Sequence, residues 1–198
     1  MTIDLSRFHW IYQPTRFELS ADKLTVHTDP NTDFWQRTYY GFRHDNAPAF
    51  LFPAQEKEFS FTVKAKWKPV KLFDQCGVAL YEDADNWFKA SVEYESKDSS
   101  KLGSVVTNLG YSDWGTTDMD SGLNEMTYRL SRRGQDFCIE NALDGKTFKQ
   151  MRIFHMHQPM DTVNIGVYAC SPLENSMKAE FSEFDFGECQ WPLHVNPE

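Results

Sequence analysis

The chain has 198 residues, with 20 lysines and arginines against 29 aspartates and glutamates, and a formal net charge of -9. Nucleic acids and anionic membranes are bound mainly through clustered Lys and Arg, so this charge balance argues against both as partners. The length is sufficient for a hydrophobic core that needs no metal or disulfide for stability. We therefore expect a globular protein with no nucleic-acid partner and no membrane partner.

The sequence predicts a protein of the cytoplasm. Its longest stretch without Asp, Glu, Lys or Arg runs for twelve residues, Thr162 to Leu173, whereas a membrane-spanning helix needs about twenty apolar residues. Asp4, Arg7 and Arg16 interrupt the first apolar runs, so the pattern of a secretory signal is missing. The cysteines form no CxxC pair and are expected to be reduced thiols: Cys76, Cys138, Cys170 and Cys189.

The periodicity of the sequence predicts β-strands along most of the chain. In Phe59 to Lys68, apolar and polar residues alternate, which places one set on each face of a strand. Further strands are expected at Leu24 to Thr28, Gln75 to Tyr81, Trp87 to Glu95, Leu102 to Asn108, Thr127 to Ser131, Asp136 to Ala142, Val163 to Cys170 and Lys178 to Phe186. Turn signals such as Arg133-Gly134 and Asp144-Gly145 separate these runs.

The spacing of these strands indicates the fold class. Strands about ten residues apart, joined by turns without helices between them, are typical of an antiparallel sandwich or barrel. No window has the apolar spacing of a long helix. We predict an all-β fold, an antiparallel two-sheet sandwich. No linker or repeat divides the chain, so we expect one domain over residues 1–198, with its core at about 24–186 and a C-terminal tail at 188–198.

The strand predicted at Trp87 to Glu95 has an unusual polar face. That face is shared by Trp87, Lys89, Ser91, Glu93 and Glu95. Two carboxyl groups at this spacing can approach the separation of about 5–5.5 Å that retaining glycosidases use. Glu93 and Glu95 are therefore the candidates for acid and nucleophile if the protein is an enzyme. The alternative is a solvated face on which Lys89 pairs with Glu93 or Glu95.

Two tryptophans lie next to aspartates in segments with loop character, Asp33-Phe34-Trp35 and Asp113-Trp114. A large ring on a loop is costly to expose unless it binds something. A sugar has an apolar face that stacks on an indole ring, and hydroxyls that bond to carboxylates and amides. These segments therefore predict a carbohydrate site. The alternative is that the rings cover the edges of the core.

Motifs for metals, nucleotides and serine chemistry are weak or absent. His155-Met156-His157 can place two imidazoles on one face of a strand, but a third ligand is missing. Asp118 to Gly122 lacks the other ligands of an EF-hand, so we expect a solvated loop. The phosphate-loop, dinucleotide and nucleophile-elbow motifs are absent. We expect neither a metal nor a cofactor.

Several segments in this order resemble the DUF1349 family, which includes the fungal "regulation of enolase" protein. They are Thr32-Asp33-Phe34-Trp35, Phe73-Asp74-Gln75-Cys76-Gly77-Val78, Trp87 to Tyr94, and Leu102 to Asn108 with Ser112-Asp113-Trp114. The resemblance extends from about Leu24 to Phe186. It implies a concanavalin A-like jelly roll whose concave sheet holds the ligand. Because such sandwiches serve as lectins, hydrolases and interaction modules, the resemblance implies the fold more firmly than the function.

The resemblance also bears on catalysis. Retaining glucanases of this superfamily carry a strand motif E-x-D-x-E, and the run that looks equivalent in this sequence is Lys89-x-Ser91-x-Glu93-x-Glu95. With a lysine beside it, Glu93 is expected to stay ionised and to be unsuited to donating a proton. Hydrolysis is therefore the weaker expectation, and the protein is expected to bind its ligand without turning it over.

Our main hypothesis is a cytosolic binding domain for a carbohydrate or sugar phosphate, with the regulatory role in carbon metabolism that the resemblance implies. The ligand-binding residues expected on the concave face are Trp35, Gln75, Lys89, Glu93, Thr107 and Trp114. The first alternative is a glycoside hydrolase or lyase that uses Glu93 and Glu95. The second is a protein-interaction module whose partner is a metabolic enzyme such as enolase.

Overall fold

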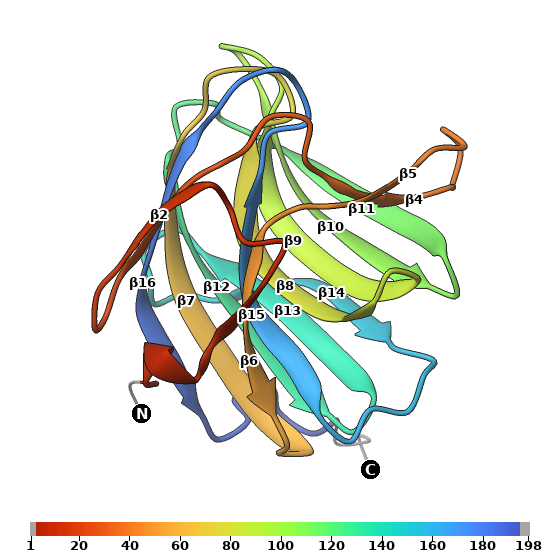
Figure 1. The fold of residues 1–198 in the computed structure, drawn as a ribbon. Helices are drawn as coiled ribbons and strands as arrows, with labels where there is room; N and C mark the ends of the chain where they lie inside the picture. Colours follow the sequence, from red (N-terminus) through yellow and green to blue (C-terminus); the bar gives the residue numbers. More distant parts are fainter. Residues whose placement is uncertain (1–2, 195–198) are drawn as a thin grey trace.

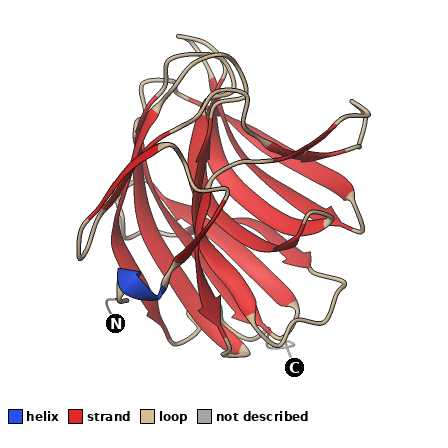
Figure 2. Cartoon of the chain, in the orientation of Figure 1, coloured by secondary structure: helices blue, strands red, loops and turns tan. Residues whose placement is uncertain are grey.

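The computed structural model describes residues 3–194. Most of these residues lie in two large antiparallel sheets that pack face to face as a jelly-roll sandwich (Figures 1 and 2). We call them the front sheet and the back sheet. A two-stranded hairpin stands apart from both sheets, drawn in orange in Figure 1. The predicted fold class is therefore confirmed.

Each large sheet has seven strands, which do not follow one another in chain order. From edge to edge, the front sheet consists of β1 (His9–Ile11), β6 (Ala49–Ala54), β15 (Val163–Cys170), β8 (Gln75–Asp83), β9 (Asn86–Tyr94), β10 (Ser100–Asn108) and β11 (Tyr111–Met119). The back sheet consists of β14 (Lys149–His155), β13 (Asp136–Ala142), β12 (Glu125–Arg133), β7 (Glu58–Lys68), β16 (Lys178–Gly187), β3 (Leu24–His27) and β2 (Arg16–Leu19). The hairpin consists of β4 (Phe34–Gln36) and β5 (Arg43–Asp45), and a 3₁₀ helix, η1 (Leu5–Arg7), precedes β1.

The core between the sheets follows the period of two in the sequence. On β7, Phe59, Phe61 and Val63 point into this core and are fully buried, as the alternation predicted. From the front sheet, Phe88 and Ala90 of β9 enter the same core. The residues that alternate with them along β9, such as Lys89 and Ser91, must then point to the other side of the sheet, which we call the outer face.

A second, smaller apolar cluster lies on the outer face of the front sheet. Trp87 and Tyr168 contribute to it from β9 and β15, and Phe34 of the hairpin packs on Trp87 with ring centroids 5.4 Å apart. The front sheet is thus covered on both faces at this end. Over the rest of β8, β9 and β10, the outer face carries polar side chains.

Hydrogen bonds fasten the hairpin to the turns at one end of the front sheet. Gln36 Nε2 donates to the carbonyl oxygen of Ala84 at 2.7 Å, and Arg43 pairs with Asp85 at 2.8 Å. Figure 1 accordingly shows β4 and β5 beside β10 and β11. The hairpin therefore has a fixed position over the outer face.

Every strand predicted from the sequence is present, and β13 and β15 have the predicted ends. The expected strand at Trp87 to Glu95 ends at Tyr94, so Glu95 lies outside it. The sequence did not predict the short strands β1, β2, β4 and β5, or the longer strands β6, β11 and β14. β6 is buried on both faces and β11 is largely exposed, so neither shows a clear alternation.

The expectation of short helices also holds. Residues 3–194 contain η1 and no α-helix, and no helix there is long and apolar enough to cross a membrane. The four cysteines are unpaired, and Cys76, Cys138 and Cys170 are buried. Of the predicted C-terminal tail, residues 188–194 form neither helix nor strand. Residues 195–198 of that tail lie outside the described residues.

Candidate functional site

A cavity of about 350 Å³ opens on the outer face of the front sheet. Its floor is formed by residues of β8, β9 and β10, and its walls by the hairpin, by β11 and by loops around Phe73 and Leu173. The structure brings five predicted binding residues together in its lining: Trp35, Gln75, Lys89, Glu93 and Trp114. This cavity is the candidate functional site.

The floor is a network of polar side chains from neighbouring strands. Gln75 of β8 lies directly opposite Glu93 of β9, and Gln75 Nε2 donates to Glu93 Oε2 at 2.6 Å. The carbonyl oxygen of the Gln75 side chain lies 2.8 Å from the hydroxyl of Tyr168, which also lies 2.8 Å from Ser91 Oγ. These contacts fix the orientation of the Gln75 amide, so the polar groups of the floor are held in place.

Lys89 forms a buried ion pair that joins the floor to the hairpin. Its Nζ lies 2.8 Å from Asp33 Oδ1, and the side chains of Lys89 and Asp33 are 6% and 19% exposed. Burial is the largest influence and would lower the pKa of Lys89, but Asp33, Cys170 and Glu93 together outweigh it, so the net shift of the pKa is upward. The backbone N–H of Phe34 also donates to Asp33 Oδ1, at 2.7 Å. Lys89 is therefore a cation whose charge is already matched.

Glu93 has the most perturbed carboxyl group of the cavity. Burial raises its pKa to about 7, although the charge of Lys89 acts in the opposite direction. Lys89 favours the ionised form of Glu93, as expected, but burial outweighs this effect and the pKa of Glu93 lies above its ordinary value. Lys89 is bonded to Asp33, which directly precedes β4, and the negative charge of Asp33 raises the pKa of Glu93 further.

The Glu93 carboxyl should make stability depend on pH. Because its pKa rises from 4.5 to about 7 on folding, the free energy of unfolding should fall as pH rises from about 4.5 to about 7. Glu93→Gln removes this effect. We expect the variant to be more stable than the wild type by about 3 kcal/mol at pH 8 and nearly equal at pH 4.5, measured by urea unfolding. The same difference at both pH values would contradict this account.

Two tryptophans form an aromatic wall of the cavity. The rings of Trp35 and Trp114 lie 6.3 Å apart in an edge-to-face arrangement. Trp35 is buried in the cluster under the hairpin, and its Nε1 donates to the carbonyl oxygen of Thr38 at 3.2 Å. Trp114, on β11, is 42% exposed. Trp35 thus covers the sheet as the alternative predicted and also lines the cavity, whereas part of the Trp114 ring is open to solvent.

Sequence reasoning missed several lining residues. The hairpin supplies Tyr40, Phe42 and His44, a loop supplies Phe73, and β10 supplies Lys101. One available signal was the run Tyr39-Tyr40-Gly41-Phe42, which places three aromatic rings in a segment without strand alternation. Asp33 was noted beside Trp35, but its pairing with Lys89 was not predicted, because 56 residues separate them in the sequence.

Two predicted residues lie outside the cavity. Thr107 points to the outer face but is fully buried, because the hairpin covers this end of the sheet. Its Oγ1 lies 2.8 Å from Ser112 Oγ, which accepts a hydrogen bond from the backbone N–H of Gln36. Glu95 follows the end of β9 and does not line the cavity. Glu93 and Glu95 are therefore not paired in its lining.

The weak metal motifs have other roles. Among residues 3–194, no three His, Cys, Asp or Glu side chains are grouped so that they could hold a metal ion. His155 Nδ1 lies 2.6 Å from Asp136 Oδ1 across the β13–β14 pair. Asp118 lies in β11 and pairs with Lys101, so the loop expected at Asp118 to Gly122 begins inside a strand.

A larger hollow, of about 730 Å³, lies between the free edges of β11 and β14. Arg152 of β14 reaches Asp113 of β11 at 3.0 Å there, and the Asp113 side chain is 79% exposed. Exposed ion pairs interact weakly with each other and are open to solvent. We therefore place the candidate site in the smaller cavity, where buried polar groups converge.

Comparisons with known proteins agree with this fold. Residues 10–189 match the family described as "Protein of unknown function (DUF1349)". "Regulation of enolase protein 1" of Saccharomyces cerevisiae is 32% identical over 181 residues, which cover 91% of this chain and 89% of the yeast protein. The crystal structure of a functionally unknown protein from Saccharomyces cerevisiae superposes with a TM-score of 0.87 at 29% identity, over 97% of this chain and 100% of that chain.

More distant structures share the sandwich. A variant of the GH43 protein BlXynB from Bacillus licheniformis has a TM-score of 0.71 at 15% identity, over 92% of this chain and 37% of that chain. A legume lectin-like domain from Entamoeba histolytica has a TM-score of 0.59 at 9% identity, over 93% of this chain and 91% of that chain. These likenesses show the fold alone. Because the family match spans most of the sequence, the chain belongs to the DUF1349 family.

Proposed function

We propose that the cavity on the outer face of the front sheet binds a small, uncharged carbohydrate. The observation that carries this proposal is the combination of an aromatic wall, Trp35 and Trp114, with a floor of fixed polar groups around Gln75 and Glu93. A sugar ring has an apolar face for the indole and hydroxyls for the amide and carboxyl groups. The volume is near the lower end of the range of ligand pockets, about 300–1,000 Å³, which favours a small ligand.

The charges of the cavity favour a neutral sugar over a sugar phosphate. Lys89 and Lys101 both line the cavity, but Lys89 is paired with Asp33 and Lys101 with Asp118. A phosphate would have to compete with a carboxylate for each cation. A hydroxyl group can instead join these pairs without separating them. The proposal therefore narrows the sequence-based hypothesis of a carbohydrate or sugar phosphate to the uncharged ligand.

Isothermal titration with glucose, galactose, mannose, xylose, arabinose and glucose 6-phosphate tests this proposal. We expect a neutral sugar to bind, and Trp114→Ala to weaken that binding at least about fivefold, because the indole ring is lost. Trp114 is partly exposed, so the variant should still fold. Ile153→Ala, an exposed apolar position on the back sheet, is the control and should leave the affinity unchanged. A folded protein that binds none of these sugars would contradict the proposal.

We further propose that residues 1–198 act as one cytoplasmic domain whose sugar binding regulates a metabolic enzyme. The name of the yeast relative supports enolase as the first partner to test. Purified enolase should bind the immobilised protein, and the saturating sugar should change the affinity. Binding of enolase without any response to sugar would assign the protein to the class of simple interaction modules. If the protein binds a sugar but does not bind enolase, the cavity remains a sugar site and enolase is not the regulated enzyme.

Hydrolysis is a second candidate, favoured by the pKa of Glu93. A carboxyl group with a pKa of about 7 in a cavity is suited to protonating a leaving oxygen. The other carboxyl group in the lining is Asp33, whose pairing with Lys89 disfavours nucleophilic attack. Aryl glucosides and aryl xylosides test this candidate. Turnover that is lost in Glu93→Gln with the fold intact would support it, and an inactive wild type would exclude hydrolysis of these substrates.

A further inference from the structure

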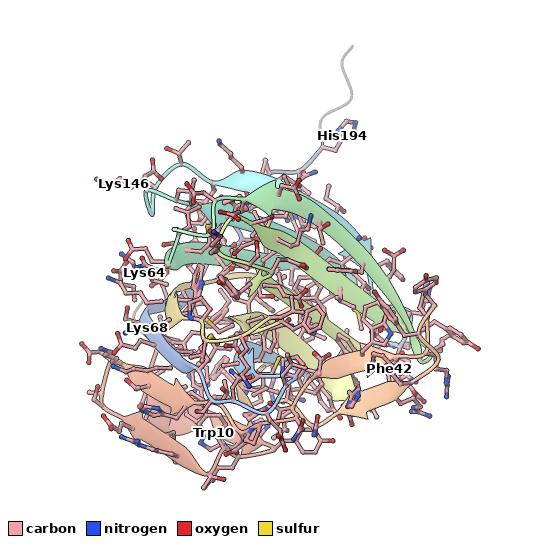
Figure 3. The ribbon with its side chains drawn as sticks, turned by 90° about the horizontal axis from the view of Figure 1, so that it is seen from above. Trp10, Phe42, Lys64, Lys68, Lys146 and His194 are labelled. Atoms are coloured by element: carbon pink, nitrogen blue, oxygen red, sulfur yellow. The ribbon has the colours of Figure 1, made fainter. Side chains whose placement is uncertain are left out.

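The loop of the hairpin, residues 37–42, presents large aromatic rings to solvent. Tyr39 is 93% exposed, Tyr40 is 52% exposed and Phe42 is 43% exposed. Figure 3 places Phe42 toward the end of the pale orange hairpin, away from Lys64 and Lys68 of the back sheet. Neighbouring exposed rings of this size mark sites of interaction on soluble proteins. We therefore infer that the loop contacts a binding partner.

These rings continue the aromatic wall of the cavity. Tyr40 lies edge-to-face with Trp35 at 5.4 Å and stacks on Phe42 at 5.5 Å, and both Tyr40 and Phe42 line the cavity. Tyr39 lies 5.0 Å from Tyr40 and is not part of the cavity lining. A ligand that leaves the cavity along this wall would meet Tyr40 first and Tyr39 next.

The backbone of the loop is held in one shape before any ligand binds. Arg37 and Tyr39 have φ angles of 58° and 62°, in the left-handed region that is unfavourable for such side chains. Hydrogen bonds maintain this shape: the N–H of Gly41 donates to Arg37 O at 2.7 Å, and the N–H of Arg37 donates to Phe42 O at 2.9 Å. A preformed loop loses less entropy when a ligand orders on it.

We propose that the loop is a second subsite, which stacks on the sugar unit next to the one in the cavity. This inference rests on the proposed function and names its ligand class as a di- or oligosaccharide. Continuity with the cavity favours a sugar chain over a protein partner, because the exposed rings extend the wall that the first sugar would contact. Tyr39 serves as the outer stacking platform and Tyr40 is shared by both subsites.

Isothermal titration with glucose, maltose and maltotriose, and with xylose, xylobiose and xylotriose, tests the second subsite. We expect the disaccharide to bind about fivefold to tenfold more tightly than its monosaccharide, since one ring contact contributes about this much. Tyr39→Asn should remove this gain and leave the monosaccharide affinity within about twofold, because Asn tolerates the left-handed backbone. Tyr39→Phe keeps the ring and should retain the gain.

The outcomes separate this inference from the proposed function. Equal affinity for monosaccharide and disaccharide, or a gain that survives in Tyr39→Asn, would overturn the second subsite while the cavity remains a sugar site. Failure of all six saccharides to bind would overturn the second subsite, and failure of galactose, mannose and arabinose as well would overturn the proposed function. If Tyr39→Asn instead weakens binding of purified enolase and leaves every sugar affinity unchanged, the loop is a protein contact and the second subsite is overturned.

Discussion

Lys89→Met is expected to lower the free energy of unfolding by about 3–5 kcal/mol. The methionine fills a similar volume but removes the cation, so Asp33 is left as a largely buried carboxylate with its ion pair broken. We expect a loss near the lower end of this range, because the Asp33 side chain is 19% exposed and water can partly solvate its charge. Urea unfolding at pH 7, followed by tryptophan fluorescence, measures the change.

Two further variants separate the buried pair from a general effect of losing a lysine. Lys57→Met removes the cation of an exposed pair with Asp161 and should cost less than about 1 kcal/mol. Combining Lys89→Met with Asp33→Asn should recover part of the loss, because no unpaired charge remains. A loss for Lys89→Met as small as that for Lys57→Met would show that the pair contributes no more than a surface ion pair.

Gly77→Ala is expected to lower the free energy of unfolding by about 4 kcal/mol or more, or to prevent folding. A methyl group at Gly77 would overlap the carbonyl oxygen of Ala90 on the neighbouring strand β9, far inside van der Waals contact. The clash is with backbone inside a paired sheet, so relief requires the strands to separate, and losses this large are exceptional for one substitution. The fraction of soluble protein and its urea midpoint measure the effect.

Gly122→Ala is the matched control for this substitution. Gly122 lies in an exposed turn, and the nearest atom to its added methyl group would be the side-chain Asp120 Oδ1 at 3.1 Å. A small movement of Asp120 relieves this contact, so stability should change by less than about 1 kcal/mol. A Gly77→Ala protein with a wild-type midpoint would show that β8 and β9 can shift at this point. Such a shift would also disturb the contact between Gln75 and Glu93.

The sequence was sufficient to predict the two-sheet sandwich and the polar face of β9. Both follow from the period of two, which is a local property of a strand. It was insufficient for β11, where glycine and polar residues hide the alternation around Trp114. The edge position and exposure of that strand leave few apolar residues to reveal its faces.

The candidate site was harder to predict than the fold, because it depends on contacts between distant segments. Thr107 was placed on the correct face, yet the hairpin that buries it comes from residues far away in the chain. The pKa of Glu93 rises mainly because Glu93 is buried, and the charge of Asp33, which comes from a distant segment just before β4, raises it further. Alternation gives the face of a side chain but not what covers it.

The base and the tip of the hairpin differ in how they are held. Its base is fixed, since Phe34 packs on Trp87 and Gln36 bonds to the turn at Ala84. Its tip, residues 37–42, meets solvent and takes no part in the core between the sheets. New tips with other rings or lengths can therefore be grafted onto the same sandwich to test how the tip affects the proposed sugar site.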